Sequence, residues 1–350
     1  MSQKKIAVLF GGCSSEYPVS LQSAYAIISN MNPEQYEKIL IGITKEGNWY
    51  RYYGSEDSIM DDTWHQKTEE CIPTMVSLNR NDHGIVEIFK NYIKRTKLDA
   101  VFPVLHGKNG EDGTVQGLFE LADIPVIGCR TLCSALCMDK DRAHKLVAQA
   151  GIHIPRSLVL TAPVEGKQLQ QMVSELVYPL FVKPVKAGSS FGITKVNHKR
   201  YLSGAVKHAF EYDNEVIIEE NIEGFEVGCA VMGNMELTMG EVDEIEVNSN
   251  FFDFTEKYTL NSSKIHMPAR IDKTTSDRIK EAAALIYRTL GCTGFARVDL
   301  FLTPKGEIVF NEVNTIPGFT SHSRYPNMMK GIGLSFDTIL DRLIVLGMEK

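Results

Sequence analysis

The stretch Gly294–Arg324, GFARVDLFLTPKGEIVFNEVNTIPGFTSHSR, is where the fold and the chemistry of this chain are most easily inferred. Two apolar segments flank the tetrapeptide Thr303–Gly306, TPKG. An early proline and a final glycine are typical of a type I turn. The stretch therefore predicts a β-hairpin.

Four polar side chains lie within the two predicted strands: Arg297, Asp299, Glu312 and Asn314. Side chains alternate between the faces of a strand, and a loop of even length would pair odd positions of one strand with even positions of the other. All four side chains then share one face. Burying such groups is costly unless they bind something, and Asp, Glu and Asn oxygens suit Mg²⁺. The alternative is an internal salt bridge between Arg297 and Glu312.

The composition is that of an ordinary globular protein. The chain has 350 residues, of which 43% are hydrophobic and 23% charged, enough for two or three domains. The net charge of −7 argues against a general nucleic-acid or anionic-membrane binder, but it is compatible with one basic pocket. No apolar run approaches the ~18 residues of a membrane span, and the first run, IAVLF, is too short for a signal-peptide core. We therefore expect a cytoplasmic protein.

Seven cysteines, an odd number, stand at positions 13, 71, 129, 133, 137, 229 and 292. No pair shows the CxxC spacing of a zinc ribbon. Cys129, Cys133 and Cys137 recur every four residues in a segment compatible with a helix, which predicts a stripe of small buried side chains. A metal role is the less favoured interpretation, because cluster-binding cysteines normally lie on irregular loops.

The N-terminal part has the pattern of an α/β unit. An apolar strand over residues 5–10 leads through the loop GGCSSEYPVS into a helix over about 19–30. The loop matches neither the dinucleotide-binding nor the P-loop motif. Glu16 precedes the helix, where its carboxylate could cap the helix or bind a ligand at the carboxyl end of a parallel strand.

A second α/β segment follows. We expect a helix near 84–95 and then a strand over 100–105. That strand ends in the loop His106–Gly113, HGKNGEDG, which combines small residues with a histidine and two acids. This composition is typical of a functional loop more than of a tight turn.

The second half carries candidate nucleotide-binding groups. Lys183 lies in an apolar strand that is followed by the loop GSSFG at 188–192. Backbone N–H groups of such a loop can hold phosphate oxygens beside a lysine, and the alternative is an ordinary hairpin turn. Glu219 and Glu226 lie at strand ends, where carboxylates could bind adenine or ribose. The polar and aromatic segment 248–263 is long enough to form a lid.

These parts together describe an ATP-grasp ligase. Over essentially the whole chain, the order and spacing of several motifs closely resemble the D-alanine–D-alanine ligase family: HGKNGEDGTVQG, MDKDRAHKL, KPVKAGSSFGITKV, EVIIEENIEGFEVG, EKY, GFARVDLF and NEVNTIPGFTSHSRYP. The resemblance implies a three-domain α/β fold that is α+β in its ATP-grasp part. The N-terminal domain, 1–137, would hold a doubly wound parallel sheet. A central ATP-grasp domain would span 138–221, and a C-terminal catalytic domain 222–350, with its lid at about 248–263.

The resemblance also implies a reaction. ATP would phosphorylate the carboxylate of a first D-alanine, and the amine of a second substrate would attack the acylphosphate. Two Mg²⁺ ions, which Mn²⁺ is able to replace, would bridge the phosphates. The product would enter peptidoglycan synthesis. The partners are then small-molecule substrates and no nucleic acid or membrane, and a homodimer is expected.

The roles of individual residues follow from the same resemblance. ATP would be bound by Lys140, Lys183, Gly188, Ser190, Glu219, Ile222 and Glu226. The metal ions would be held by Asp299, Glu312 and Asn314. Catalytic roles fall to Glu16, Ser189, Lys257, Tyr258, Arg297 and Gly318. Among them Glu16 would bind the ammonium of the first D-alanine, while Arg297 and the Gly318 N–H would stabilise the oxyanion. The substrate pocket would comprise His106, Asp243, Phe252, Ser323 and Arg324.

Arg324 departs from the commonest pattern of the family, which has leucine at this position. An arginine here, with Phe252, resembles the D-alanine–D-serine ligases of the vancomycin-resistance type. A guanidinium can donate to a hydroxyl, directly or through an acid such as Asp243, whereas leucine cannot. The Lys257–Tyr258 pair favours attack by an amine over attack by a hydroxy acid.

Two alternatives stay open. The chain could be a D-alanine–D-alanine ligase of cell-wall synthesis with an atypical pocket. It could also be a non-catalytic ATP-binding or scaffold protein that has kept the fold. The intact set of Glu16, Lys183, Arg297, Asp299, Glu312 and Asn314 argues against a scaffold, which needs none of them.

Overall fold

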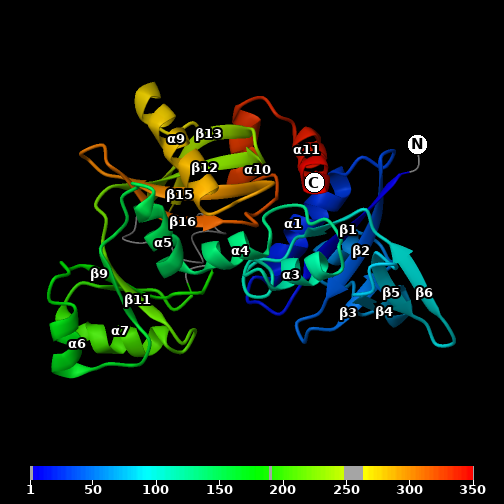
Figure 1. The fold of residues 1–350 in the computed structure, drawn as a ribbon, viewed down its shortest axis with the longest axis horizontal. Coiled ribbons are helices and arrows are strands. Elements are labelled where there is room, and N and C mark those ends of the chain that lie inside the picture. The colour runs from blue at the N-terminus through cyan, green and yellow to red at the C-terminus, as the bar shows by residue number, and fades with distance from the viewer. Residues whose placement is uncertain (1–2, 189–190, 248–262, 350) are drawn as a thin grey trace.

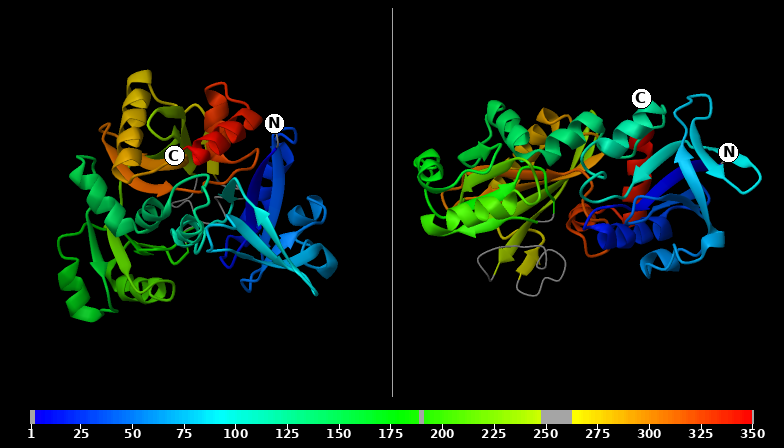
Figure 2. Two further views of the ribbon diagram at one scale, coloured as in Figure 1. Left: turned by 45° about the vertical axis from the view of Figure 1, so that its right-hand side comes forward. Right: turned by 90° about the horizontal axis from the view of Figure 1, so that it is seen from below.

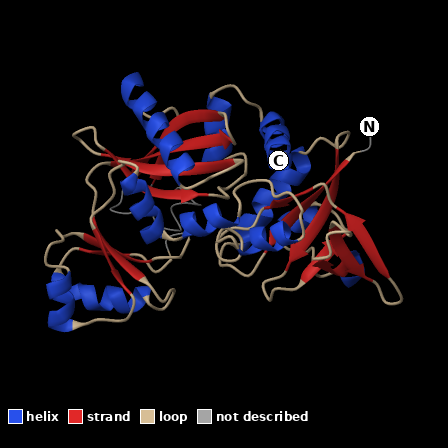
Figure 3. Ribbon diagram, in the orientation of Figure 1, coloured by secondary structure: helices blue, strands red, loops and turns tan. Residues whose placement is uncertain are grey.

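The computed structural model describes residues 3–188, 191–247 and 263–349. Three β-sheets occupy successive parts of the chain, and helices pack against them (Figures 1 and 3). This is the mixed α/β architecture that the sequence predicts. Each predicted domain contains one sheet, while the domain boundaries stay a prediction. No helix within these described ranges is long and apolar enough to cross a membrane.

The N-terminal sheet has seven strands in the order β6-β5-β4-β3-β2-β1-β7. β1 pairs in parallel with β2 and β7, and the other neighbours are antiparallel. The bounds are β1 (Lys4–Gly11), β2 (Tyr36–Ile43), β3 (Trp49–Tyr52), β4 (Cys71–Val76), β5 (Gly84–Ile88), β6 (Ile93–Lys97) and β7 (Ala100–Pro103).

Strand β1 is covered on both faces. Its residues 6, 8 and 10 pack with helices α1 (Tyr17–Asn30) and α11 (Phe336–Met348), and residues 7 and 9 pack on the side of α3 (Thr114–Leu121). A parallel strand buried on both faces reads as one continuous apolar run, which is why it was recognisable in the sequence. Helix α11 brings the C-terminal end of the chain back onto the N-terminal sheet (Figure 2).

The helix expected near 84–95 is wrong. This segment forms the antiparallel hairpin of β5 and β6, in which Ile85 lies opposite Thr96 and Ile88 opposite Ile93. The segment is rich in β-branched residues, which fit a pleated sheet better than a helix. The chain reverses between the two strands at residues 89–92, where the rings of Phe89 and Tyr92 stack.

The central sheet is antiparallel, in the order β10-β9-β11-β8. Its strands are β8 (Ser157–Leu160), β9 (Leu180–Pro184), β10 (Thr194–Val196) and β11 (Val216–Glu220), and its core includes residues of α6 (Gly166–Met172) and α7 (Leu202–Ala209). Three short elements complete this part and the N-terminal part: α2 (Asp57–Met60), η1 (Thr68–Glu70) and η2 (Lys199–Tyr201).

The C-terminal sheet has the order β14-β13-β12-β15-β16. Its strands are β12 (Phe225–Gly233), β13 (Leu237–Val247), β14 (Ser263–His266), β15 (Phe295–Leu302) and β16 (Ile308–Asn314). One face packs with residues of α4 (Thr131–Met138), α5 (Lys140–Gln149) and α9 (Lys273–Thr289). The other face packs with α10 (Arg324–Gly331), which links it to the core shared with α11.

The opening hairpin is confirmed as β15 and β16, but its connection is not of even length. Residues 303–307 join the strands, so Leu302 lies opposite Ile308. That register alone would put the polar residues of the two strands on opposite faces. A β-bulge between Asp299 and Leu300 shifts the register by one residue, so that Asp299 faces Glu312. The shared polar face therefore depends on the bulge and not on the loop length.

Candidate active site

A cavity of about 290 Å³ lies where the N-terminal loops, the α4–α5 junction and the C-terminal hairpin meet. Its walls include ten residues that the sequence analysis singled out: Glu16, His106, Lys140, Gly188, Arg297, Glu312, Asn314, Gly318, Ser323 and Arg324. These residues come from five separate stretches of the sequence. Their convergence makes this cavity the candidate active site.

Arg297 and Asp299 form the centre of the polar face on the hairpin. Arg297 donates from Nε to Asp299 Oδ1 at 2.8 Å and from Nη2 to Oδ2 at 2.6 Å. Asn314 Nδ2 also donates to Oδ2, at 2.8 Å. Burial disfavours the charged form of Arg297, but the neighbouring Asp299 more than offsets this, so the pKa of Arg297 is raised. The salt-bridge alternative paired Arg297 with Glu312, whereas the ion pair found here joins it to its strand neighbour.

The oxygen donors of the hairpin fit a Mg²⁺ site. Asp299 and Glu312 face each other across the strands, and Asn314 lies two residues further on β16. A carboxylate offers about four lone-pair directions, so Asp299 can keep its contact with Arg297 and still bind a cation. Two carboxylates and an amide oxygen are the hard ligands that Mg²⁺ prefers.

Arg324 is the most heavily paired residue of the cavity wall. Its Nε donates to Asp243 Oδ2 at 2.7 Å and its Nη2 to Oδ1 at 2.8 Å. Its Nη1 lies 3.0 Å from Glu226 Oε1 and 3.4 Å from Asp299 Oδ1. Only 8% of its side chain is exposed. Burial lowers the pKa of the guanidinium, but the carboxylates, Asp243 foremost, raise it well above the usual value.

Gly228 makes room for this arrangement. A Cβ at this position would stand 2.3 Å from Arg324 Nη2 and 2.8 Å from Asp243 Oδ1. The bidentate pair therefore requires a residue without a side chain on β12. Gly228 and the contact between Arg324 and Glu226 were not predicted from the sequence. Neither is visible from sequence spacing, because both depend on how α10 lies across the sheet.

The Glu219 carboxylate lies beside two nitrogen-bearing side chains outside the cavity wall. Lys183 Nζ lies 2.6 Å from Glu219 Oε2. Burial raises the pKa of Glu219, but the positive charge of Lys183 opposes this, and the net shift is downward. His144 Nε2 lies 2.8 Å from the Asn311 carbonyl and must donate to it, which leaves Nδ1 as an acceptor.

Two buried acceptors consequently face each other. His144 Nδ1 lies 3.4 Å from Glu219 Oε1. Neither atom has a hydrogen-bond partner within the described part of the chain. Burial lowers the pKa of His144, so the ring is neutral and cannot bridge the gap with a proton of its own. Unpaired buried acceptors are costly, so this place is suited to a ligand donor.

The glycine loops of the N-terminal and central parts converge on Glu16. This residue is the N-cap of α1, but its side chain makes no capping hydrogen bond. A Cβ on Gly107 would stand 2.5 Å from Glu16 Oε2, and one on Gly188 would stand 2.9 Å from it. Glu16 as a whole is 7% exposed and lines the cavity. These contacts favour the ligand-binding interpretation of Glu16 over the capping one.

Glu111 is a cavity residue that the sequence analysis did not select, although it marked the loop 106–113. It accepts from the backbone N–H of Gly107 at 2.8 Å and from that of Ile316 at 3.2 Å. It thereby joins the N-terminal loop to the segment after β16. Burial, and then the charge of Glu16, raise the pKa of Glu111 to about 8.

His106 and Ser323 support the same wall. His106 Nε2 lies 3.1 Å from Ser23 Oγ, and burial lowers the pKa of the ring. Ser323 Oγ accepts from Thr320 N–H at 2.9 Å, and a Cβ on Gly318 would stand 3.0 Å from this oxygen. Ile222 lies in the connection from β11 to β12. The remaining predicted residues, Ser189, Ser190, Phe252, Lys257 and Tyr258, and nearly all of the lid, lie outside the described residues.

Comparisons with known proteins identify the family of this chain. Residues 5–129 match the family model described as D-ala D-ala ligase N-terminus, and residues 146–345 match D-ala D-ala ligase C-terminus. Vancomycin C-type resistance protein VanC1 of Enterococcus gallinarum is 44% identical over 99% of both chains. A D-alanine–D-alanine ligase of Caldicellulosiruptor bescii is also 44% identical, over 100% of this chain and 96% of its own.

A solved structure is closely similar as well. The VanG D-Ala:D-Ser ligase from Enterococcus faecalis is 61% identical, with a TM-score of 0.92, over 99% of this chain and 100% of its own. The matched models, the identities and the converging site residues lead to one assignment. The chain belongs to the D-alanine–D-alanine ligase family and is an ATP-dependent ligase.

Proposed function

We propose that this enzyme joins D-alanine to D-serine through a D-alanyl phosphate, and that the dipeptide serves altered peptidoglycan precursors in vancomycin resistance. The observation that carries the proposal is the bidentate pair of Arg324 and Asp243 at the cavity. The similarity to a protein described as a D-Ala:D-Ser ligase supports it.

The first step transfers a phosphoryl group. The carboxylate of the first D-alanine attacks the γ-phosphorus of ATP, ADP leaves, and an acylphosphate forms. Lys140 and Lys183 supply positive charge for the phosphates, and the loop at Gly188 supplies backbone N–H groups. Lys140 Nζ already contacts this loop, at 2.8 Å from the Ala187 carbonyl.

The two unpaired acceptors, His144 Nδ1 and Glu219 Oε1, are suited to bind adenine. The exocyclic amino group of adenine carries two hydrogens, and His144 Nδ1 and Glu219 Oε1 are two unpaired acceptors 3.4 Å apart. One amino group would satisfy both. The Ile222 backbone and Glu226 complete the predicted nucleotide edge.

Metal ions, if bound by Asp299, Glu312 and Asn314, would neutralise the charge of the phosphates during transfer. Mn²⁺ has the same preference for oxygen ligands. Asp299 also orients Arg297 through two hydrogen bonds, so the same carboxylate would serve both the metal and the arginine.

The second step forms the amide bond. Glu16 binds the ammonium of the first D-alanine, the amine of the second substrate attacks the acyl carbon, and inorganic phosphate leaves. Arg297 and the Gly318 N–H donate to the oxyanion that forms, a contribution of about 3 kcal/mol per donor in comparable acyl-transfer sites. By the family resemblance, Ser189 and Tyr258 would join Glu16 in a hydrogen-bonded link, and Lys257 would reach toward the transferring phosphate.

Selection of D-serine rests on Arg324. The side chain is fixed by Asp243 and Glu226, so its remaining donor capacity is held in one orientation at the cavity wall. A serine hydroxyl can satisfy buried polar groups that the methyl group of alanine leaves unpaired, and such a mismatch discriminates strongly. Phe252, His106 and Ser323 complete the pocket.

The second candidate is a D-alanine–D-alanine ligase of cell-wall synthesis. It is favoured by the Caldicellulosiruptor relative, whose 44% identity equals that of the VanC1 protein.

We further propose that the enzyme is cytoplasmic and forms a homodimer that acts on small molecules. The net charge of −7 supports the absence of a nucleic-acid partner.

One assay separates these functions. The protein is incubated with ATP, Mg²⁺ and D-alanine at neutral pH, with and without D-serine, and phosphate and dipeptides are quantified. The proposal expects D-Ala–D-Ser to dominate when both amino acids are present. A D-Ala–D-Ala yield equal to or above that of D-Ala–D-Ser would favour the second candidate, and no phosphate release in any mixture would favour a scaffold.

A further inference from the structure

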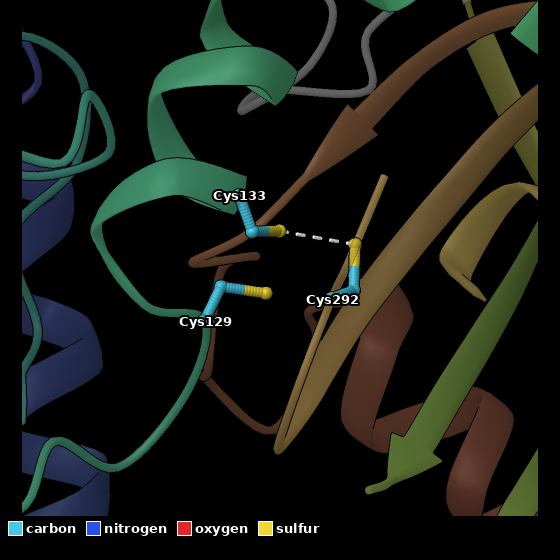
Figure 4. Close-up of side chains that lie close together, drawn as sticks. All are labelled: Cys129, Cys133 and Cys292. Carbon is cyan, nitrogen blue, oxygen red and sulfur yellow. Dashed lines mark hydrogen bonds between the residues drawn. The ribbon is translucent and has the colours of Figure 1, made fainter. Parts of the chain in front are cut away.

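Four buried cysteines gather between α4 and the turn that follows α9. Cys133 and Cys137 lie on α4. Cys129 precedes this helix and Cys292 lies between α9 and β15, and Figure 4 shows both of them beside Cys133. The Sγ–Sγ distances are 3.3 Å for Cys133–Cys292, 3.8 Å for Cys133–Cys137 and 4.0 Å for Cys137–Cys292. The sulfurs of Cys129, Cys133 and Cys292 all lie within 4.8 Å of one another.

We propose that these four cysteines bind a zinc ion, with Cys133, Cys137 and Cys292 as the inner three ligands and Cys129 as the fourth. Zinc–sulfur bonds of about 2.3 Å in a tetrahedron place the sulfurs about 3.8 Å apart. The three distances in the structure lie on both sides of this value. The sulfur of Cys129 lies within 4.8 Å of those of Cys133 and Cys292, and it would have to move toward that of Cys137 to complete the tetrahedron.

The arrangement goes beyond the packing expected from the sequence. The spacing of four on a helix accounts for the burial of Cys133 and Cys137, but not for the sulfur of Cys292, which lies 155 residues after Cys137 in the sequence. A disulfide would use only two of these sulfurs, whereas three of them surround one point. Soft thiolate ligands also separate this site from the oxygen ligands on the β15–β16 hairpin.

The binding step is balanced by proton release. Zinc replaces four thiol protons, and the product is a tetrathiolate with a net charge of −2. Cys133 lies in the first turn of α4, where the helix dipole stabilises negative charge. Cys137 lines the active-site cavity and is 6% exposed, so an ion can reach the buried cluster along this wall.

The ion would connect parts of the chain that meet at the active site. Cys129 Sγ lies 3.4 Å from the Thr293 carbonyl and 3.6 Å from that of Phe295. Gly294, with φ +68°, lies so close to Gly128 that a Cβ would stand 2.9 Å from its Cα. Zinc would therefore join the loop before α4 to the start of β15, the strand that carries Arg297.

Cobalt titration tests the proposal. The full chain is reduced, freed of metal with a chelator, and titrated with Co²⁺ in excess Mg²⁺ without ATP. The expected result is one Co²⁺ per chain, with a sulfur-to-cobalt charge-transfer band, intense tetrahedral d–d bands, and displacement of both by Zn²⁺. A weak octahedral spectrum without the charge-transfer band overturns the proposal.

Matched variants locate the site. Cys133→Ala and Cys292→Ala are expected to lose the charge-transfer band while circular dichroism shows a folded chain. Cys71→Ala and Cys229→Ala remove buried cysteines outside the cluster and should keep it. A band that survives in Cys292→Ala, or fewer than seven free thiols in the unfolded, chelator-treated wild type before any reduction, contradicts the zinc site. The wild-type titration decides the matter even if a variant fails to fold.

Discussion

Arg324 and Asp243 form a bidentate ion pair, with Nε and Nη2 of the arginine 2.7 and 2.8 Å from the two carboxylate oxygens. Arg324 begins α10 and Asp243 lies on β13, so the pair fixes a helix to the sheet behind the cavity. Both side chains are almost fully buried. The pair thus belongs to the fold and to the pocket at once, and its removal has two separable effects.

Arg324→Leu is expected to shift the product from D-Ala–D-Ser toward D-Ala–D-Ala, by about 10- to 100-fold in the ratio of kcat/KM values, because a hydroxyl loses its donor. It also leaves Asp243 buried without its partner, which should cost about 3–5 kcal/mol of unfolding free energy. Urea unfolding and competition assays measure the two effects.

The double variant Arg324→Leu/Asp243→Asn is the control. It removes the uncompensated charge, so it should regain part of the stability and keep the altered product ratio. An unchanged ratio in both variants would remove Arg324 from the specificity argument.

Gly228→Ala should weaken the same pair without removing either partner. The added Cβ would stand 2.3 Å from Arg324 Nη2, so the guanidinium must move. We expect the D-serine preference to fall, with a loss of stability of about 1–3 kcal/mol from overpacking. Gly204→Ala is the control: it lies in α7 with nothing within 4 Å of its Cβ position, and it should stabilise the chain slightly. Equal D-serine preference in wild type and Gly228→Ala would contradict the prediction.

Glu111 should make stability depend on pH. Its folded pKa of about 8 lies above the ordinary value of 4.5. Between these values the folded chain holds a proton that the unfolded chain has released, so the free energy of unfolding falls as pH rises. The stabilisation that the protonated Glu111 gives the folded chain is fully present below pH 4.5 and is lost as the pH rises to about 8.

Glu111→Gln should flatten this pH dependence. The free energies of unfolding of wild type and variant are measured by urea unfolding from pH 5 to 9, and the difference between them should change mainly below pH 8. Glu236→Gln removes an exposed carboxyl and is the control. Parallel curves for wild type and Glu111→Gln would show that the carboxyl ionises normally.

Glu219→Gln should raise the KM for ATP and reduce the preference for ATP over GTP, because an amide presents a donor as well as an acceptor toward the base. An effect of about 10-fold corresponds to one hydrogen bond to a charged group. Glu220→Gln is the neighbouring control, since Glu220 pairs with exposed Arg156. Steady-state kinetics with both nucleotides measure this effect, and an equal effect of the two substitutions would place the adenine elsewhere.

The sequence was informative where local pattern determines structure. The apolar run of β1 and the hairpin of β15 and β16 follow from side-chain periodicity and turn residues. The segment 84–95 was misassigned because a short apolar segment fits either a helix or a strand. The bulge at Asp299 was not predictable, since it depends on the sheet around it.

Contacts between segments far apart in the sequence could not be predicted either. Cys292 joins the other cysteines, and Glu111 joins Ile316, only after the sheets have packed. The motifs nevertheless identified most of the cavity wall, because many of its residues stand at strand ends and in glycine loops, which can be recognised in a sequence.

Product analysis tests the central claim most directly. The purified enzyme, ATP and Mg²⁺ are mixed with equimolar D-alanine and D-serine at neutral pH, and the dipeptides are quantified by mass spectrometry. The account predicts that D-Ala–D-Ser exceeds D-Ala–D-Ala in the wild type and that Arg324→Leu reverses this order. A wild type that forms mainly D-Ala–D-Ala would contradict it.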